Sequence, residues 1–158
     1  LNDKIMADEL RKIKPSEEEA VRDSLQRHFP SIRVDKLKAS PAIKDNENFM
    51  GIITKLDIKG YDREKGEDVQ MSLIMKTMPD SAERRATFNV DAAFINEAAF
   101  YSRVLPTLQQ YADLKFAPCL QARPDLILLR HLGQDGYIPV ERTEGLDLQH
   151  CELVLREL

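Results

Sequence analysis

The stretch VQMSLIMKTMP, residues 69–79, decides the fold, because it alternates like a half-buried strand yet carries a lysine, Lys76, in an apolar run. Successive side chains of a strand point to opposite faces of a sheet. The odd-numbered positions share one face: Val69, Met71, Leu73 and Met75. The even-numbered positions share the other: Gln70, Ser72, Ile74 and Lys76. We expect the odd face in the core, and a buried ammonium on the other face needs either water or an acidic partner.

Two earlier stretches also alternate and predict strands that pair with this one. They are SIRVDKLKASPAI, residues 31–43, and IITKLDIKG, residues 52–60. A polar, turn-like segment, Lys44–Gly51, separates them, and the charged segment Gly60–Asp68 predicts a hairpin loop before the third strand. The order therefore predicts three consecutive antiparallel strands.

Helical periodicity appears on both sides of these strands. Ser16 followed three residues later by Glu19 is a capping-box pattern, and it predicts a helix to about His28 with Val21 and Leu25 facing inward. A second, longer helix follows the third strand within residues 81–112. Its apolar stripe has three- and four-residue spacings and consists of Phe94, Ala98, Tyr101, Leu105 and Leu108.

Two residues of the long helix stand apart from its apolar stripe. Pro106 is expected to kink or divide the helix near its end. Glu97 lies beside the stripe rather than opposite it. Beyond this helix, Phe116–Gln121 and Leu126–Leu132 are short strand candidates separated by a turn, and a last helix is expected to start near Leu146.

The element order predicts an α+β fold with the layout of a protein-kinase-like N-lobe, a five-stranded antiparallel sheet with one long helix. We expect a helical segment over residues 1–30 and the lobe over residues 31–132. Residues 133–158 would then hold the hinge exit and the start of a helical C-lobe.

Composition excludes several classes of protein. The 158 residues carry a formal net charge of -4, which argues against a nucleic-acid or anionic-membrane surface. No apolar run approaches the length of a membrane span. The cysteines, Cys119 and Cys151, form no close pair, which favours the cytoplasm. The histidines have no metal-ligand spacing, so no metal site is expected in this chain. The oligomeric state stays open.

Lys76 and Glu97 are the candidate catalytic residues. A lysine at the end of an apolar strand matches the form of the kinase pattern V-A-I-K, whose lysine contacts nucleotide phosphates. An acidic residue about 20 positions later, in the middle of the helix, stands where a kinase-like fold places that lysine's partner. The alternative is that Lys76 ends an edge strand and that Glu97 is an ordinary surface carboxylate.

Several phrases, in order, resemble the insect ecdysteroid kinase-like family, which is related in fold to choline kinases and aminoglycoside phosphotransferases. They are ENFMGIITKLDI (47–58), SLIMKTMP (72–79), FINEAAFYSRVLPTL (94–108), FAPCL (116–120), LILLRHLGQDGY (126–137) and ERTEGLDLQHCELVLREL (141–158). The resemblance implies ATP-dependent phosphorylation of a hydroxyl on a small, fairly apolar molecule, with ecdysteroids as the best-known substrates.

The resemblance also assigns site residues. Lys76 matches the phosphate-binding lysine and Glu97 its helix partner, and Ile74 matches the apolar side chain beside adenine. Leu129 and His131 fall in the hinge, whose backbone would bind the adenine edge. The loop over the phosphates is matched by Asn46, Glu47, Asn48, Phe49 and Gly51.

Two departures from the family pattern stand out. Where family members show L-E-D-L at the hinge, this chain has Leu129, Arg130, His131 and Leu132, so the local charge is reversed. The catalytic loop H-G-D-x-W-x-x-N and the D-F-Q-type segment that binds Mg²⁺ are both missing, and His150 is followed by Cys151. We therefore expect an inactive N-terminal fragment with exposed apolar surface, whose Mg²⁺ ligands lie beyond Leu158.

Two other functions remain open from the sequence. One is a non-catalytic binding or regulatory protein with a kinase-like lobe. The other is a phosphotransferase that acts on choline-like or aminoglycoside-like cations. The reading frame beyond Leu158 distinguishes the first from an enzyme, because an enzyme needs the missing catalytic and metal-binding segments.

Overall fold

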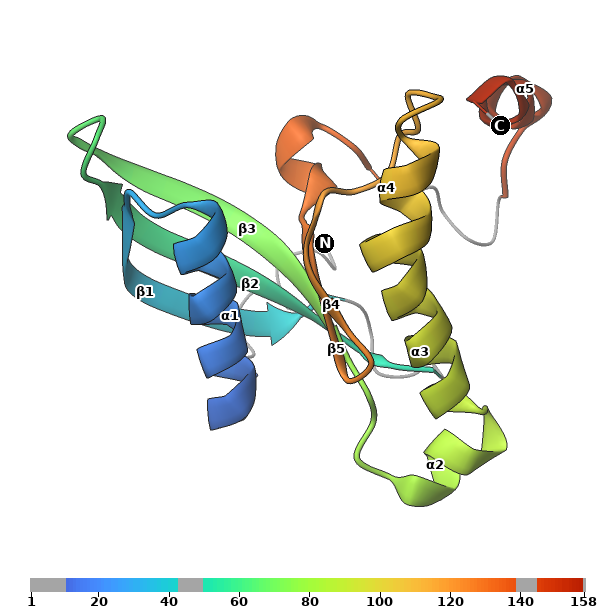
Figure 1. Ribbon diagram of the computed structural model, residues 1–158, viewed down its shortest axis with the longest axis horizontal. Coiled ribbons are helices and arrows are strands. Elements are labelled where there is room, and N and C mark those ends of the chain that lie inside the picture. Colours follow the sequence, from blue (N-terminus) through green and yellow to red (C-terminus); the bar gives the residue numbers. More distant parts are fainter. Residues whose placement is uncertain (1–10, 43–49, 139–144, 158) are drawn as a thin grey trace, which may run out of the picture.

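The computed structural model describes residues 11–42, 50–138 and 145–157. Its centre is a five-stranded antiparallel sheet with the spatial order β1-β2-β3-β5-β4 (Figure 1). The strands are β1 (Ile32–Pro41), β2 (Ile52–Asp62), β3 (Glu67–Thr77), β4 (Cys119–Arg123) and β5 (Leu126–Arg130). The α+β class and the five antiparallel strands predicted from sequence are confirmed, and the layout is consistent with a kinase-like N-lobe.

Helices lie on both faces of this sheet. The helices are α1 (Pro15–His28), α2 (Ala82–Thr87), α3 (Val90–Ala99), α4 (Leu105–Leu108) and α5 (Leu148–Glu157). A π-helical turn, η1 (Phe100–Val104), joins α3 to α4, and a 3₁₀ turn, η2 (Leu132–Asp135), follows β5. Figure 1 shows α1 over β1 and β2, and α3 on the β4 and β5 side of the molecule.

The larger core lies between α1 and the sheet. Leu73 and Met75 on β3 are buried there, as the alternation predicts, and they pack with Leu56 and Ile58 of β2. Val21 and Leu25 of α1 are buried in the same cluster, also as predicted. A smaller core on the opposite face contains the buried side chains Val90, Phe94 and Ile127.

The cap of α1 differs from the predicted one. The helix begins at Pro15, because proline is pre-organised for the first helical position and has no N–H to leave unpaired. The carboxylate of Glu17 therefore accepts the backbone N–H of Lys14 at 2.8 Å. Ser16 and Glu19, the residues of the predicted capping box, lie within the first turns of the helix. The cap therefore forms earlier in the chain than predicted. Lys14 replaces Ser16 as the N-cap residue, and Glu17 replaces Glu19 as the acid.

The long helix is divided near Pro106, as predicted, but the interruption begins before the proline. Directly after η1, the N–H of Leu105 donates to the carbonyl of Phe100, five residues back. Pro106 offers no N–H to the carbonyl four residues before it, so the regular ladder cannot continue there. The wider turn changes the helical phase. Leu105 stays buried, whereas Leu108 is 45% exposed, so its predicted place in the apolar stripe is wrong.

The last helix, α5, begins at Leu148, because Asp147 caps it. The N–H of His150 donates to Asp147 Oδ1 at 2.8 Å, and this bond lowers the pKa of the carboxyl. Figure 1 shows α5 well away from the sheet. Its large apolar side chains are accordingly exposed: Leu148, Leu153, Val154 and Leu155. Among the helices of the described residues, none is long and apolar enough to cross a membrane.

Removing a core side chain of α1 tests this packing. Leu25 is 2% exposed and Leu153 is 59% exposed. We expect Leu25→Ala to lower the free energy of unfolding by about 3 kcal/mol, because it leaves a cavity between α1 and the sheet. Leu153→Ala, the control, should change it by about 0.5 kcal/mol or less. Urea titration followed by far-UV circular dichroism measures both values, and equal losses would contradict the assigned core.

Candidate functional site

The site is built around the end of β3. Lys76 pairs with Ile53 on β2 and with Ile127 on β5, so it lies in the middle of the sheet rather than at an edge. Its side chain is on the face opposite Met75, and that face is covered by α3. The alternative, that Lys76 ends an edge strand, is therefore wrong.

Lys76 and Glu97 are brought into contact across the sheet–helix boundary. The Nζ of Lys76 lies 2.5 Å from Oε2 of Glu97, although the residues are 21 positions apart in the chain. The side chains are 24% and 28% exposed, respectively, so the pair is sheltered and still reachable from solvent. Glu97 thus supplies the acidic partner that an ammonium in an apolar strand needs.

Phe94 and Gly51 enclose the lysine from two other sides. The Nζ of Lys76 lies 5.3 Å from the centre of the Phe94 ring, within cation–π distance. Phe94 is buried and precedes Glu97 by three positions on α3, so both residues face the sheet. A Cβ added to Gly51 would lie 3.2 Å from Cε of Lys76 and 3.3 Å from Cζ of Phe94. The absent side chain of Gly51 leaves the room that the lysine stem occupies.

An apolar strip continues from Lys76 toward the hinge. Ile74, two positions before Lys76 on the same face, pairs in register with Leu129 on β5. Both side chains are partly buried. A fixed ammonium next to partly buried apolar side chains suits a ligand that has an anionic end and a flat apolar end.

The hinge backbone is already engaged with its neighbours. The N–H of His131 donates to the carbonyl of Ser72 at 3.2 Å, and the N–H of Arg130 donates to the carbonyl of Pro118 at 2.8 Å. These two amides already donate within the chain, so neither is free to donate to a ligand. The Nη2 of Arg130 lies 2.6 Å from Oδ1 of Asp135, so the reversed charge at the hinge has a local counter-charge.

The phosphate-loop candidates Asn46, Glu47, Asn48 and Phe49 lie outside the described residues, whereas Gly51 is described and lies against Lys76. The structure thus brings together Gly51, Ile74, Lys76, Glu97 and Leu129, with His131 directly after β5.

Two titratable groups, Tyr101 and Cys119, pack against the small core that contains Phe94. Burial raises the pKa of Tyr101, and the negative charge of Glu97 adds to the effect. Burial also raises the pKa of the Cys119 thiol. Both groups therefore keep their protons at neutral pH. Within residues 11–42, 50–138 and 145–157, no cluster of three or more His, Cys, Asp or Glu side chains could hold a metal ion.

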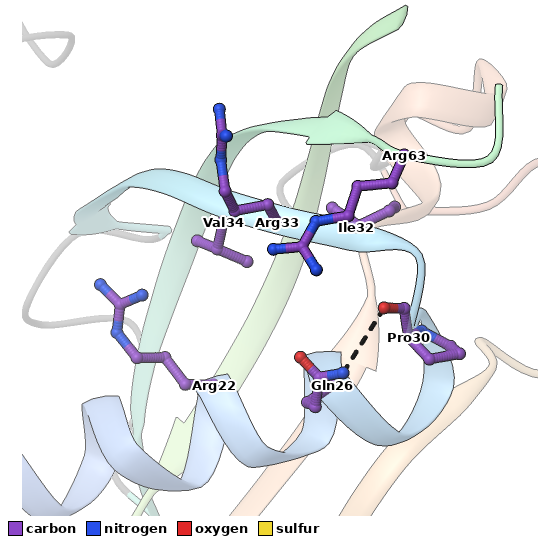
Figure 2. Close-up of a pocket in the computed structure, with 7 residues that line it drawn as sticks. All are labelled: Arg22, Gln26, Pro30, Ile32, Arg33, Val34 and Arg63. Carbon is purple, nitrogen blue, oxygen red and sulfur yellow. Dashed lines mark hydrogen bonds between the residues drawn. The ribbon is translucent and has the colours of Figure 1, made fainter. Parts of the chain in front are cut away.

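A separate pocket of about 170 Å³ lies between α1 and β1 and is lined by several arginines (Figure 2). It lies on the α1 face of the sheet, away from Lys76. Arg22 is paired with Glu18 at 2.8 Å and Arg33 with Asp35 at 2.7 Å, and the Arg33 guanidinium lowers the pKa of the Asp35 carboxyl. These carboxylates neutralise two of the lining cations, and none of the lining residues belongs to the site around Lys76.

Sequence reasoning did not find the part that Phe94 plays, because its place in the apolar stripe explained it as a core residue. The available signal was its three-residue spacing from Glu97, which places both side chains on one helix face. It also did not find the contacts of Gln134 with β3. Ser72 and Gln134 are 62 positions apart, and no local sequence pattern indicates that they are in contact.

The sheet order, with a lysine in β3 paired to an acid in α3, is that of a kinase-like phosphotransferase lobe. The model of the ecdysteroid kinase-like family matches residues 45–158, and the chain belongs to that family. The match begins after β1, so α1 and β1 lie outside it. No curated protein and no solved structure gives a significant match.

Acetylation by limiting acetic anhydride tests the enclosure of Lys76. We expect Lys76 to be acetylated several-fold more slowly than Lys65, because the Glu97 carboxylate and the Phe94 ring shelter its amine, whereas Lys65 is 67% exposed. Gly51→Val should bring the two rates closer, since a branched side chain occupies the space of the lysine stem. Peptide mass spectrometry measures both rates, with Lys65 as the internal control. Equal rates in the unmodified sequence would contradict the enclosure.

Proposed function

We propose that the chain is the nucleotide-binding part of a kinase that transfers the terminal phosphoryl group of ATP to a hydroxyl of a small, fairly apolar molecule. The observation that carries this proposal is the 2.5 Å contact between Lys76 Nζ and Glu97 Oε2, made from the middle of the sheet to α3. Membership of the ecdysteroid kinase-like family supports the same class of reaction.

The chemistry of the pair supports a phosphate ligand. A lysine ammonium is a compact point charge suited to phosphate oxygens, and Glu97 orients it before a ligand arrives. Phosphoryl transfer depends chiefly on positioning and on stabilising charge at the oxygens. In this proposal Lys76 binds phosphate oxygens of ATP, Glu97 holds Lys76 in place, and Gly51 leaves the lysine stem unobstructed.

The apolar strip supports a purine at the other end of the ligand. Ile74 and Leu129 lie side by side on adjacent strands, on the face that carries Lys76. We place the adenine against them, with the hinge after β5 at its edge. The residues Asn46, Glu47, Asn48 and Phe49 are proposed to close over the phosphates, in keeping with the resemblance of this segment to the family's phosphate loop.

The acceptor and the metal are proposed on the family alone. A hydroxyl of an ecdysteroid-like molecule is the acceptor that the family description suggests, although fold does not fix function. ATP normally acts with Mg²⁺, but the described residues offer no cluster of metal ligands. Neither the Mg²⁺ ligands nor the base that accepts the hydroxyl proton is therefore assigned to a described residue.

Replacing Lys76 in the full-length protein tests the proposal. We expect Lys76→Met to lower turnover at least a hundredfold, because removal of one charge-stabilising group from a transfer site costs about that much. Glu97→Gln should also lower turnover, since it leaves the ammonium unheld. Lys65→Met in the β2–β3 turn is the matched control and should leave turnover unchanged. Phosphate transfer from radiolabelled ATP to an ecdysteroid measures the effect, with circular dichroism to verify folding.

Full activity in Lys76→Met would contradict the assignment of the lysine. A wild-type protein that binds no adenine nucleotide would instead favour a non-catalytic binding protein. Transfer to choline-like or aminoglycoside-like cations, but not to an ecdysteroid, would keep the kinase and change the acceptor.

A further inference from the structure

We infer that Gln134 is a positioning residue, which fastens the hinge to β3 and so sets where the base of a bound nucleotide lies. The inference rests on the proposed function. It starts from the place where the β3–β5 ladder stops. The ladder ends with Leu73 opposite Arg130. Ser72, which precedes Leu73 on β3, therefore has no partner within β5.

Ser72 finds its partners in the segment that follows β5. Its carbonyl accepts the N–H of His131 at 3.2 Å. Its own N–H donates to Oε1 of Gln134 at 2.8 Å. The carboxamide of Gln134 therefore takes the place of a strand carbonyl, and the ladder continues for one residue beyond the end of β5.

The anchor on β3 is itself held firmly. Ser72 is buried, and its hydroxyl donates to Oδ1 of Asp57 on β2 at 2.7 Å. Nζ of Lys55 lies 3.2 Å from the same carboxylate oxygen. Two strands thus fix the residue to which Gln134 binds, and the loss of its acceptor would remove a part-buried hydrogen bond.

The turn that carries Gln134 is held at the adjacent positions too. A Cβ on Gly133 would lie 2.8 Å from Cε1 and Nε2 of His131, so the glycine lies directly against the imidazole. Asp135 is paired with Arg130 at 2.6 Å. Gln134 thus contacts β3, Asp135 contacts the last residue of β5, and Gly133 contacts the residue that follows β5. The position of the hinge is therefore fixed before any ligand binds.

This arrangement separates two parts of nucleotide binding. Lys76 and Glu97 lie on the phosphate side, whereas Gln134 lies beyond the opposite end of the Ile74–Leu129 pair. Loss of the Gln134 carboxamide would loosen the hinge, although its other contacts remain, and would leave the lysine contacts intact. Gln134 should thus affect ligands that carry a base and not ligands that consist of phosphates alone.

The test compares Gln134→Leu with Gln134→Glu in the full-length protein. Leucine removes the acceptor, whereas glutamate keeps an oxygen for the Ser72 N–H. The lysines that line the same pocket, Lys36, Lys38 and Lys59, can balance the added charge. Gln110→Leu, an exposed glutamine at the end of the long helix, is the matched control. Calorimetry measures the Kd for ATP and for inorganic tripolyphosphate.

We expect Gln134→Leu to weaken ATP about threefold to tenfold, the range for one lost hydrogen bond, and to leave tripolyphosphate unchanged. Gln134→Glu should restore ATP affinity, and Gln110→Leu should match the wild type. Equal weakening of both ligands, or of neither, in Gln134→Leu would overturn the inference.

Hydrogen exchange supplies a readout that needs no ligand. The Ser72 amide proton, followed by NMR, should exchange faster in Gln134→Leu than in the wild type, because its acceptor is gone. Unchanged protection would overturn the fastening itself. A wild type that binds neither ligand would instead refute the proposed function, while the exchange rates would still decide whether Gln134 holds the hinge.

Discussion

The ion pair between Lys76 and Glu97 is the interaction on which the rest of the site depends, because it ties the middle strand of the sheet to α3. Its formation needs the register of β3, which turns Lys76 away from the main core, and the phase of α3, which turns Glu97 toward the sheet. A shift of one residue in β3 would place the lysine among the buried side chains of the other face. The register is therefore a condition of the ion pair as well as of packing.

The same strand serves two layers. Leu73 and Met75 complete the core against α1, while Ser72, Ile74 and Lys76 face the side where ligand contacts are proposed. Two polar residues of that second face have firm partners: Ser72 pairs with Asp57 and the hinge, and Lys76 pairs with Glu97. Because these partners come from β2, α3 and the turn after β5, β3 links the proposed phosphate side of the site to its hinge side.

Local periodicity was enough to predict the five strands, the inward residues Val21 and Leu25, and the face of Lys76, since each depends on neighbours in sequence. Glu97 was predicted from spacing and from the family resemblance together. The helix details were missed because proline chemistry changed them. Pro15 moved the cap to Lys14 and Glu17, and Pro106 with the π turn exposed Leu108. The Ser72–Gln134 contact spans 62 positions and depends on where β5 stops, which no local pattern records.

The most direct measurement asks whether Lys76 lies beside the phosphates of bound ATP. An acyl phosphate of ATP transfers its acyl group to an amine close to the terminal phosphate, and peptide mass spectrometry identifies the acylated lysine. We expect acylation of Lys76 in the full-length protein, suppressed by excess ATP but not by excess ribose. Acylation elsewhere with Lys76 untouched, or labelling of Lys76 that ATP does not suppress, would contradict the proposed role of the ion pair.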